Sequence, residues 1–156
     1  ERQKFRIRWY GNDVEKINKP KLEIKKRINE LGDKDIFEIS DFTIENINSL
    51  SREIAALTKV NTNLIPVLLS SYQRSYWGTS DQKFRITVDY DMEFHSIMNE
   101  SKFNQYAYMD RAIVLELKYD EEEEHQADRI AQFIPFRRTK NSKYVIGVEQ
   151  SNTWLV

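Results

Sequence analysis

Charged and apolar side chains alternate with a period of two in five separate segments of the chain. Arg6 and Arg8 lie two residues apart in "KFRIRWYG", residues 4–11, and the apolar Ile7 and Trp9 fill the alternate positions. Successive side chains of a β-strand point to opposite faces, so this pattern predicts one charged and one apolar face. The same alternation recurs at Glu23 and Lys25, at Tyr72, Arg74 and Tyr76, at Arg85, Thr87 and Asp89, and at Glu116 and Lys118.

The order of these patterns predicts a mainly antiparallel α+β protein of about six or seven strands and two helices. Strands are expected at residues 3–11, 20–28, 34–40, 65–78, 82–91, 107–120 and 142–150. The second and third are expected to pair across the turn "NELGDK". Residues 41–59, with Asp41 or Thr43 as the cap, and residues 121–134 have the three- and four-residue spacing or the acidic first turn of helices.

Length and composition narrow the class of protein. A chain of 156 residues is long enough for one domain with a real core, and we expect residues 1–156 to form it. The 24 Lys and Arg residues are balanced by 25 Asp and Glu, so general nucleic-acid binding is not indicated and cations must be concentrated locally. The absence of Cys excludes disulfides, thiolate metal sites and a Cys nucleophile.

The sequence also bears on the location of the protein and on whether the chain is a fragment. No apolar run reaches the length of a membrane span and no signal peptide is visible, which favours a cytoplasmic protein or one at the cytoplasmic face of a membrane. The chain starts without Met and almost directly on a strand. We therefore interpret it as a fragment that lacks upstream elements, which leaves open a homo-oligomer in which two chains complete each other.

Two interpretations of the charged faces remain open at this point. An antiparallel sheet commonly has one face in water, and a solvated Arg or Lys needs no further explanation. If the faces instead converge, two like charges about 4 Å apart repel by ~4 kcal/mol at an effective dielectric near 20. Such a lumen needs an anion. Arg suits phosphate because its fork donates two parallel charge-assisted hydrogen bonds, and carboxylates among the cations suit a hard divalent ion.

Six short motifs, in order, resemble the VTC domain of polyphosphate polymerases, which belongs to the triphosphate tunnel metalloenzymes. They are "RIRWYG", "LEIKKR", "YQRSYW", "FRITVD", "LELKY" and "SKYVIG", and they extend from Phe5 to about Gly147. The resemblance implies an antiparallel β-barrel with flanking helices and a basic tunnel. It also implies transfer of the γ-phosphate of ATP to a growing polyphosphate chain with Mn²⁺ or Mg²⁺, by an enzyme of the ATP–polyphosphate phosphotransferase type. The family's first strand has no counterpart in this fragment, which leaves open whether the fragment itself is active.

Carried over position by position, the resemblance implies a role for each matching residue. Lys143 is expected to be catalytic, because it matches a Lys regarded as essential to transfer. Glu116 matches the metal-ligating carboxylate, and Glu23 is a second candidate ligand. The residues expected to bind phosphate, which include Lys118 on the face of Glu116, are Arg6, Arg8, Lys25, Arg74, Arg85, Lys118, Lys140 and Ser142.

The stretch from Lys34 to Ser40 departs from the family pattern, since it offers Ile36, Phe37 and Glu38 where a basic run is usual. This departure favours the alternative of a non-catalytic module that binds polyphosphate or triphosphate. A hydrolase of the same superfamily, acting on tripolyphosphate or nucleoside triphosphates, is a separate alternative. A further alternative is a sheet that stacks single-stranded nucleic acid on aromatic rings. It is disfavoured because the aromatic residues lie among apolar positions, where rings more often pack: Trp9, Tyr72, Tyr76 and Trp77.

Overall fold

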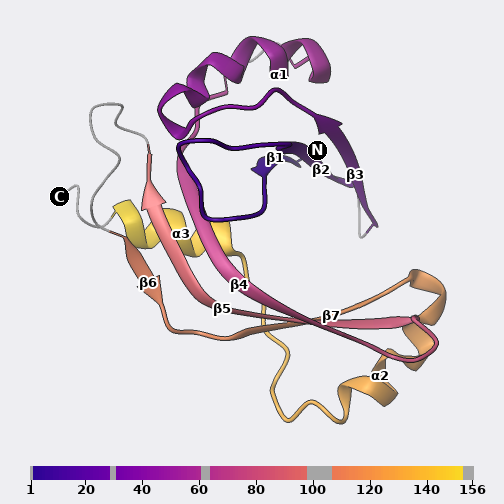
Figure 1. Cartoon of the computed structure of the whole chain (residues 1–156). Coiled ribbons are helices and arrows are strands. Elements are labelled where there is room, and N and C mark those ends of the chain that lie inside the picture. The colour runs from indigo at the N-terminus through magenta and orange to yellow at the C-terminus, as the bar shows by residue number, and fades with distance from the viewer. Residues whose placement is uncertain (1, 29–30, 61–63, 98–106, 153–156) are drawn as a thin grey trace. The chain divides into compact units, whose positions relative to one another are not determined.

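The computed structural model describes residues 2–28, 31–60, 64–97 and 107–152 (Figure 1). The chain divides into two compact units, Glu1–Pro66 and Val67–Val156, which we call the N-terminal and C-terminal units and describe one at a time. Each unit combines antiparallel strands with helical segments, which confirms the predicted α+β class. The prediction that residues 1–156 form a single domain stays a prediction.

The N-terminal unit is a three-stranded antiparallel sheet followed by a helical segment. Its elements are β1 (Arg2–Arg8), β2 (Lys21–Ile28), β3 (Leu31–Glu38), the 3-10 helix η1 (Ile44–Leu50) and α1 (Ser51–Thr58). The strand order is β1-β2-β3. The predicted pairing of the second and third strands is confirmed, although β3 begins earlier than expected, at Leu31. Asn29 and Glu30 of the predicted turn lie outside the described residues.

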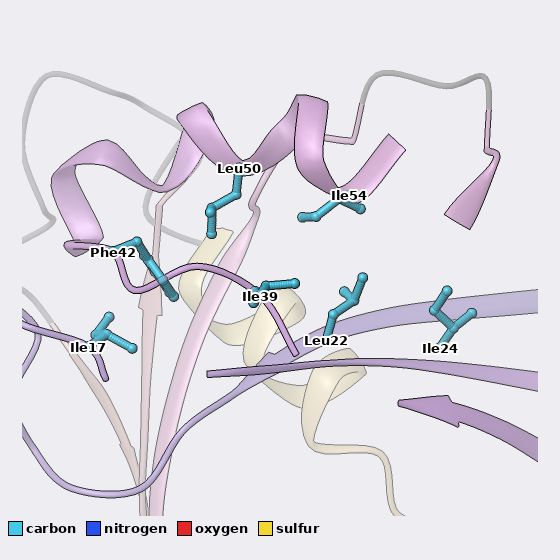
Figure 2. Packing of buried hydrophobic residues seen from close by; sticks show 7 residues of the cluster. All are labelled: Ile17, Leu22, Ile24, Ile39, Phe42, Leu50 and Ile54. Carbon is cyan, nitrogen blue, oxygen red and sulfur yellow. The ribbon is translucent and has the colours of Figure 1, made fainter. Parts of the chain in front are cut away.

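The apolar face of this sheet packs against the helical segment. Leu22 and Ile24 on β2 are buried, and Leu50 and Ile54 point toward them from η1 and α1 (Figure 2). Burying each of these side chains stabilises the fold by about 1.5–3 kcal/mol. The remaining buried members of this core are Ile17, Ile39 and Phe42. The period-two pattern therefore predicted the inward face of β2 correctly.

The start of the helical segment is set by a capping box. Thr43 Oγ1 accepts a hydrogen bond from Asn46 N at 3.3 Å, and Asn46 Oδ1 accepts one from Thr43 N at 2.8 Å. These two hydrogen bonds satisfy backbone N–H groups at the start of the helix that would otherwise have no partner. Of the two predicted caps, Thr43 is thus confirmed. Asp41 instead accepts a hydrogen bond from the backbone N–H of Lys19.

The C-terminal unit is built around one long strand. Its strands are β4 (Leu68–Gly78), β5 (Phe84–Ser96), β6 (Tyr108–Asp110) and β7 (Val114–Tyr119). One edge of β5 pairs with β4, whereas β6 and β7 pair with opposite halves of the other edge, all antiparallel. The prediction of one strand over residues 107–120 was therefore wrong. The segment is interrupted after Asp110, whose side chain accepts a hydrogen bond from the N–H of Ala112.

A β-bulge in β5 changes which side chains share a face. Arg74 pairs with Asp89 and Ser70 pairs with Phe94, so the five residues 70–74 of β4 lie opposite the six residues 89–94 of β5. Asp91, inside this interval, has a φ of 51°. In a regular strand Asp89 and Phe94 would point to opposite faces. The extra residue of the bulge instead places both on the same face.

Three helical segments complete the C-terminal unit: η2 (Glu121–Glu123), α2 (Glu124–Ala131) and α3 (Lys143–Asn152). The first two confirm the helix predicted for residues 121–134, with its acidic first turn. The strand predicted for residues 142–150 was wrong, because this segment is the helix α3, which lies against β4, β5 and β6 (Figure 1). None of the described helices combines the length and apolarity that a membrane span needs.

The helical state of α3 was hidden because its packed face is not apolar. The buried positions of its interior are Gly147 and Ser151, four residues apart, and Ser151 Oγ donates to the carbonyl of Gly147. Tyr144 and Val145, which suggested a strand, remain 45% and 37% exposed. Small residues carry no hydrophobic periodicity, so the period of the apolar residues was misleading here.

Gly147 allows α3 to approach the sheet closely, so we expect Gly147→Ala to destabilise the protein. A Cβ at this position would lie 2.5 Å from Phe94 Cδ1 and 2.6 Å from Leu68 Cδ2. Such overpacking typically costs about 1–3 kcal/mol, of which the better helix propensity of Ala returns about 1 kcal/mol. Chemical denaturation should show a net loss, whereas Val145→Ala on the exposed side should stay within about 0.5 kcal/mol. Unchanged stability of Gly147→Ala would contradict this packing.

Hydrogen bonds join the described strands into two open sheets, one in each unit, and close neither into a barrel. The predicted barrel therefore stays a prediction.

Candidate functional site

A buried carboxylate gathers three cations on the charged face of the N-terminal sheet. The side chain of Glu23 on β2 is 0% exposed, and Arg6, its register partner on β1, donates from Nε to Glu23 Oε2 at 3.0 Å. Glu23 Oε1 lies 3.0 Å from Arg8 Nη2 and 3.0 Å from Lys34 Nζ. We call these four residues the Glu23 cluster.

The Glu23 cluster carries an excess of positive charge. Burial by itself would raise the pKa of Glu23, but the hydrogen bonds from Arg6 and Lys34 and the charges of Arg6 and Arg8 lower it from 4.5 to about 2. The carboxylate is therefore ionised at neutral pH. Three cations and one carboxylate leave two net positive charges, held on side chains that are between 32% and 46% exposed. This face can attract an anion.

A row of lysines extends the positive charge across the same face. Lys4, Lys25 and Lys34 occupy one register row across β1, β2 and β3. Like charges directly opposite one another in a sheet are destabilising. A polyanion bound along this row would therefore reduce the repulsion between the lysine ammonium groups. The row places Lys25, a residue predicted to bind phosphate, on the face of Glu23.

A second carboxylate organises the charged face of the C-terminal sheet. Asp89 on β5 is 1% exposed and accepts two hydrogen bonds from Arg74 on β4, at 2.5 Å from Nε to Oδ1 and 2.7 Å from Nη2 to Oδ2. Lys143 Nζ, at the first residue of α3, lies 2.6 Å from Asp89 Oδ2. We call Arg74, Asp89 and Lys143 the Asp89 cluster. It contains two residues that the sequence predicted for the site.

Tyr72 supports both cations of the Asp89 cluster. The Arg74 guanidinium lies 5.1 Å and the Lys143 ammonium 5.0 Å from the centre of its ring. These are cation–π distances, at which the ring face attracts the charge. Tyr76 adds a similar contact to Arg74 at 5.9 Å. Of the rings considered for base stacking, Trp9 packs edge-on against Phe42, while Trp77 is 66% exposed.

The electrostatics of the Asp89 cluster parallel those of the Glu23 cluster. Burial opposes ionisation of Asp89, yet the hydrogen bonds from Arg74 and Lys143 hold its pKa below the usual value. The hydrogen bond to Asp89 raises the pKa of Arg74. Two cations and one carboxylate leave one net positive charge. A cation at a helix N-terminus is disfavoured by the macrodipole, so the ion pair with Asp89 offsets a cost that Lys143 meets there.

Three further predicted residues lie on the face of Asp89. Arg85 pairs in register with Lys118 and lies on the same side of β5 as Asp89, while Glu116 pairs with Thr87. Lys118 Nζ lies 3.3 Å from Glu116 Oε2, and both side chains are about half exposed. The sheet register therefore confirms the predicted sharing of a face by Arg85 and Asp89 and by Glu116 and Lys118. The roles of Arg85, Lys118 and Glu116 stay predictions.

Lys140 and Ser142 lie just before α3. Lys140 is exposed in the coil that leads into this helix. Ser142 precedes the first helical residue, and its carbonyl accepts a hydrogen bond from Ile146 N at 3.0 Å. Its Oγ lies 3.5 Å from Val145 N, where it caps the helix. Ser142 thus has a structural function, and phosphate contacts by either residue stay predictions.

The two predicted metal ligands have different surroundings. Both oxygens of Glu23 face cations, so a divalent ion there would have to displace Arg or Lys, and this donor set does not fit a metal. Glu116 is 51% exposed beside Lys118. Within the described ranges, no three residues of Asp, Glu, His or Cys form a group that could hold an ion. The requirement for Mn²⁺ or Mg²⁺ stays a prediction.

Sequence reasoning missed Lys34 and Asp89. Lys34 is the first residue of the stretch 34–40, which departs from the basic run usual in the family, and the pairing of β3 with β2 brings it to Glu23. Asp89 was recognised as sharing the face of Arg85, but no role was assigned to it. The signal in both cases was an acid and a base at the same strand parity on neighbouring strands, which becomes informative only when the register is known.

The fold and the two clusters define a class: an antiparallel α+β protein whose charged sheet faces carry more cations than acids around a buried carboxylate. A family model described as the VTC domain matches residues 1–152. The chain therefore belongs to the VTC domain family, as the six motifs indicated. No match was found among curated proteins or among solved structures.

Proposed function

We propose that this chain is a polyphosphate polymerase-type domain that binds a triphosphate and transfers the γ-phosphate of ATP to a growing polyphosphate chain. The observation that carries the proposal is the excess of cations over carboxylates in both clusters. Each cluster holds its cations on a buried acid, so they are in place before a ligand arrives. Membership of the VTC family supports a polyphosphate-related substrate.

The donors that remain in each cluster suit phosphate oxygens. An Arg side chain has five N–H donors and a Lys ammonium has three. Arg74 uses two of its donors and Lys143 one in the hydrogen bonds to Asp89, so several remain for an incoming ligand. Charge-assisted hydrogen bonds of this kind are about twice as strong as neutral ones. Arg6 and Arg8 offer the same capacity in the Glu23 cluster.

The proposed reaction needs positioning and charge stabilisation, and it needs no protein nucleophile. A terminal oxygen of the acceptor phosphate attacks the γ-phosphorus of ATP, the bond to the β,γ-bridging oxygen breaks, and ADP leaves. Lys143 would stabilise the charge that spreads over the transferred group, while Arg74 and Arg85 hold its neighbours. We further propose that the polymer passes through a basic tunnel, as the resemblance to polyphosphate polymerases implies.

The test is direct assay of the protein with ATP and Mn²⁺, with gel analysis of the phosphate products. We expect long phosphate chains, with one ADP released for each phosphate that is added. In parallel, calorimetric titration with tripolyphosphate should show binding that weakens steeply as salt is raised, because exposed cations are screened.

The same experiment separates the alternatives. Salt-sensitive binding with no ATP turnover would replace the polymerase by a non-catalytic polyanion module. Release of inorganic phosphate without chain growth would indicate a hydrolase. Absence of both binding and turnover would overturn the proposed function entirely.

A further inference from the structure

We propose that Asp89 is a positioning residue that holds the Lys143 ammonium and the Arg74 guanidinium side by side for phosphoryl transfer. In this role it contacts neither the substrate nor a metal. The inference rests on the proposed function, because it takes Lys143 as the catalytic residue.

Asp89 joins elements that are far apart in the sequence. Arg74 comes from β4, Asp89 from β5 and Lys143 from the start of α3, which is 54 positions further along the chain than Asp89. Three contacts of 2.5, 2.7 and 2.6 Å connect them. Without this carboxylate, Arg74 and Lys143 would be like charges over one ring, and each would move away from the other.

The Asp89 carboxylate is inaccessible to an incoming ligand. It is 1% exposed, whereas Arg74 and Lys143 are 19% and 20% exposed. Oδ1 faces Arg74, and Oδ2 faces both Arg74 and Lys143. A ligand therefore meets the cations first, and the acid acts through them.

The fold of the C-terminal unit supports the contact between Lys143 and Asp89. The bulge in β5 places Phe94, which packs against Gly147 of α3, on the same face as Asp89. The docked helix thereby brings its first residue, Lys143, to the carboxylate. A misplacement of about 1 Å in such an arrangement can cost on the order of 100-fold in rate.

A positioning role predicts that rate and binding respond differently to mutation. Asp89→Asn removes a negative charge, which by itself favours binding of an anion. It also replaces a carboxylate oxygen by an amide that cannot hold the Lys143 ammonium. We expect the kcat of polyphosphate synthesis to fall at least about 20-fold, while the Kd for tripolyphosphate changes less than about threefold.

A second readout does not depend on activity. Acetylation of Lys143 by an amine-reactive ester, followed by mass spectrometry, should be several-fold faster in Asp89→Asn than in the wild type. Acetylation of Lys118 on the same sheet should be unchanged. The matched control is Asp91→Asn, which removes the same charge from an exposed position of the same strand, and Asn tolerates its positive φ. This variant should keep wild-type kcat, Kd and labelling.

The outcomes are decisive in each direction. Unchanged labelling of Lys143 in Asp89→Asn, or unchanged kcat, overturns the inference. Parallel losses of kcat and binding would show a merely structural residue, and gains in both would show an inhibitory one. If the wild type makes no polyphosphate, the proposed function fails, while the labelling still decides whether Asp89 holds Lys143.

A conservative variant covers the case in which Asp89→Asn does not fold. Asp89→Glu keeps the charge but shifts the carboxylate by one carbon–carbon bond, about 1.5 Å. We expect a kcat at least about 10-fold below wild type with an unchanged Kd. Wild-type kcat in Asp89→Glu would contradict the requirement for an exact position.

Discussion

Replacing Lys143 with methionine should lower ATP-dependent polyphosphate synthesis by about 100- to 1,000-fold. Methionine keeps the apolar stem and the helical preference of the residue, so α3 should stay folded, and Asp89 keeps both hydrogen bonds from Arg74. What is lost is the positive charge that we propose acts on the transferred phosphate, and removal of one such stabilising donor costs about 10²- to 10³-fold in kcat. Initial rates of ADP formation and chain growth measure the effect.

Lys83→Met is the matched control for this variant. Lys83 lies in the same unit, but its ammonium pairs with Glu123 at 2.6 Å, away from the Asp89 cluster. The substitution removes the same charge and should leave kcat within about twofold. Circular dichroism should show both variants folded. Wild-type activity in a folded Lys143→Met protein would remove Lys143 from the mechanism.

Replacing Glu23 with glutamine should destabilise the N-terminal unit by about 3 kcal/mol at neutral pH. The pKa of Glu23 is about 2 instead of 4.5, and each pKa unit corresponds to about 1.4 kcal/mol. The amide of glutamine would turn N–H donors toward Arg8 and Lys34, which need acceptors. Urea denaturation at pH 7 measures the difference, and Glu15→Gln, an exposed acid of the same unit, should change stability by less than about 0.5 kcal/mol.

The pH dependence of this difference has a definite sign. A carboxylate whose folded pKa is lowered stabilises the protein above its unfolded pKa, and this contribution is lost as the pH falls through the folded value. The stabilities of wild type and Glu23→Gln should therefore differ fully above pH 4.5 and converge between pH 4.5 and about 2. A difference that persists at pH 2 would show that Glu23 acts through packing and not through its charge.

The sequence predicted the strands and their faces better than it predicted which charged side chains pair with one another. The alternation at Arg6 and Arg8, and at Glu23 and Lys25, identified the charged face of the N-terminal sheet, because a half-buried strand must separate its polar and apolar side chains. It also predicted the buried Leu22 and Ile24. The role of Lys34 was missed because pairing across β2 and β3 depends on the register, which a single strand does not contain.

The misassignment of α3 has a different physical cause. Period-based reasoning needs an apolar face, and α3 packs through Gly147 and Ser151, which carry no such signal. The resemblance therefore predicted Lys143 as a site residue, but the sequence pattern placed it on a strand. Only the docked helix explains how Lys143 reaches Asp89.

By itself the sequence determined the family, the α+β class and the parity of the five alternating segments, because all three depend on local order along the chain. The tertiary structure alone decided which charges become partners. The register of β1, β2 and β3 brings Lys34 to Glu23, and a single extra residue in β5 brings the helix and Asp89 to one face. Ion pairs act over about 3 Å between residues far apart in the sequence, so their identity is a property of the folded chain.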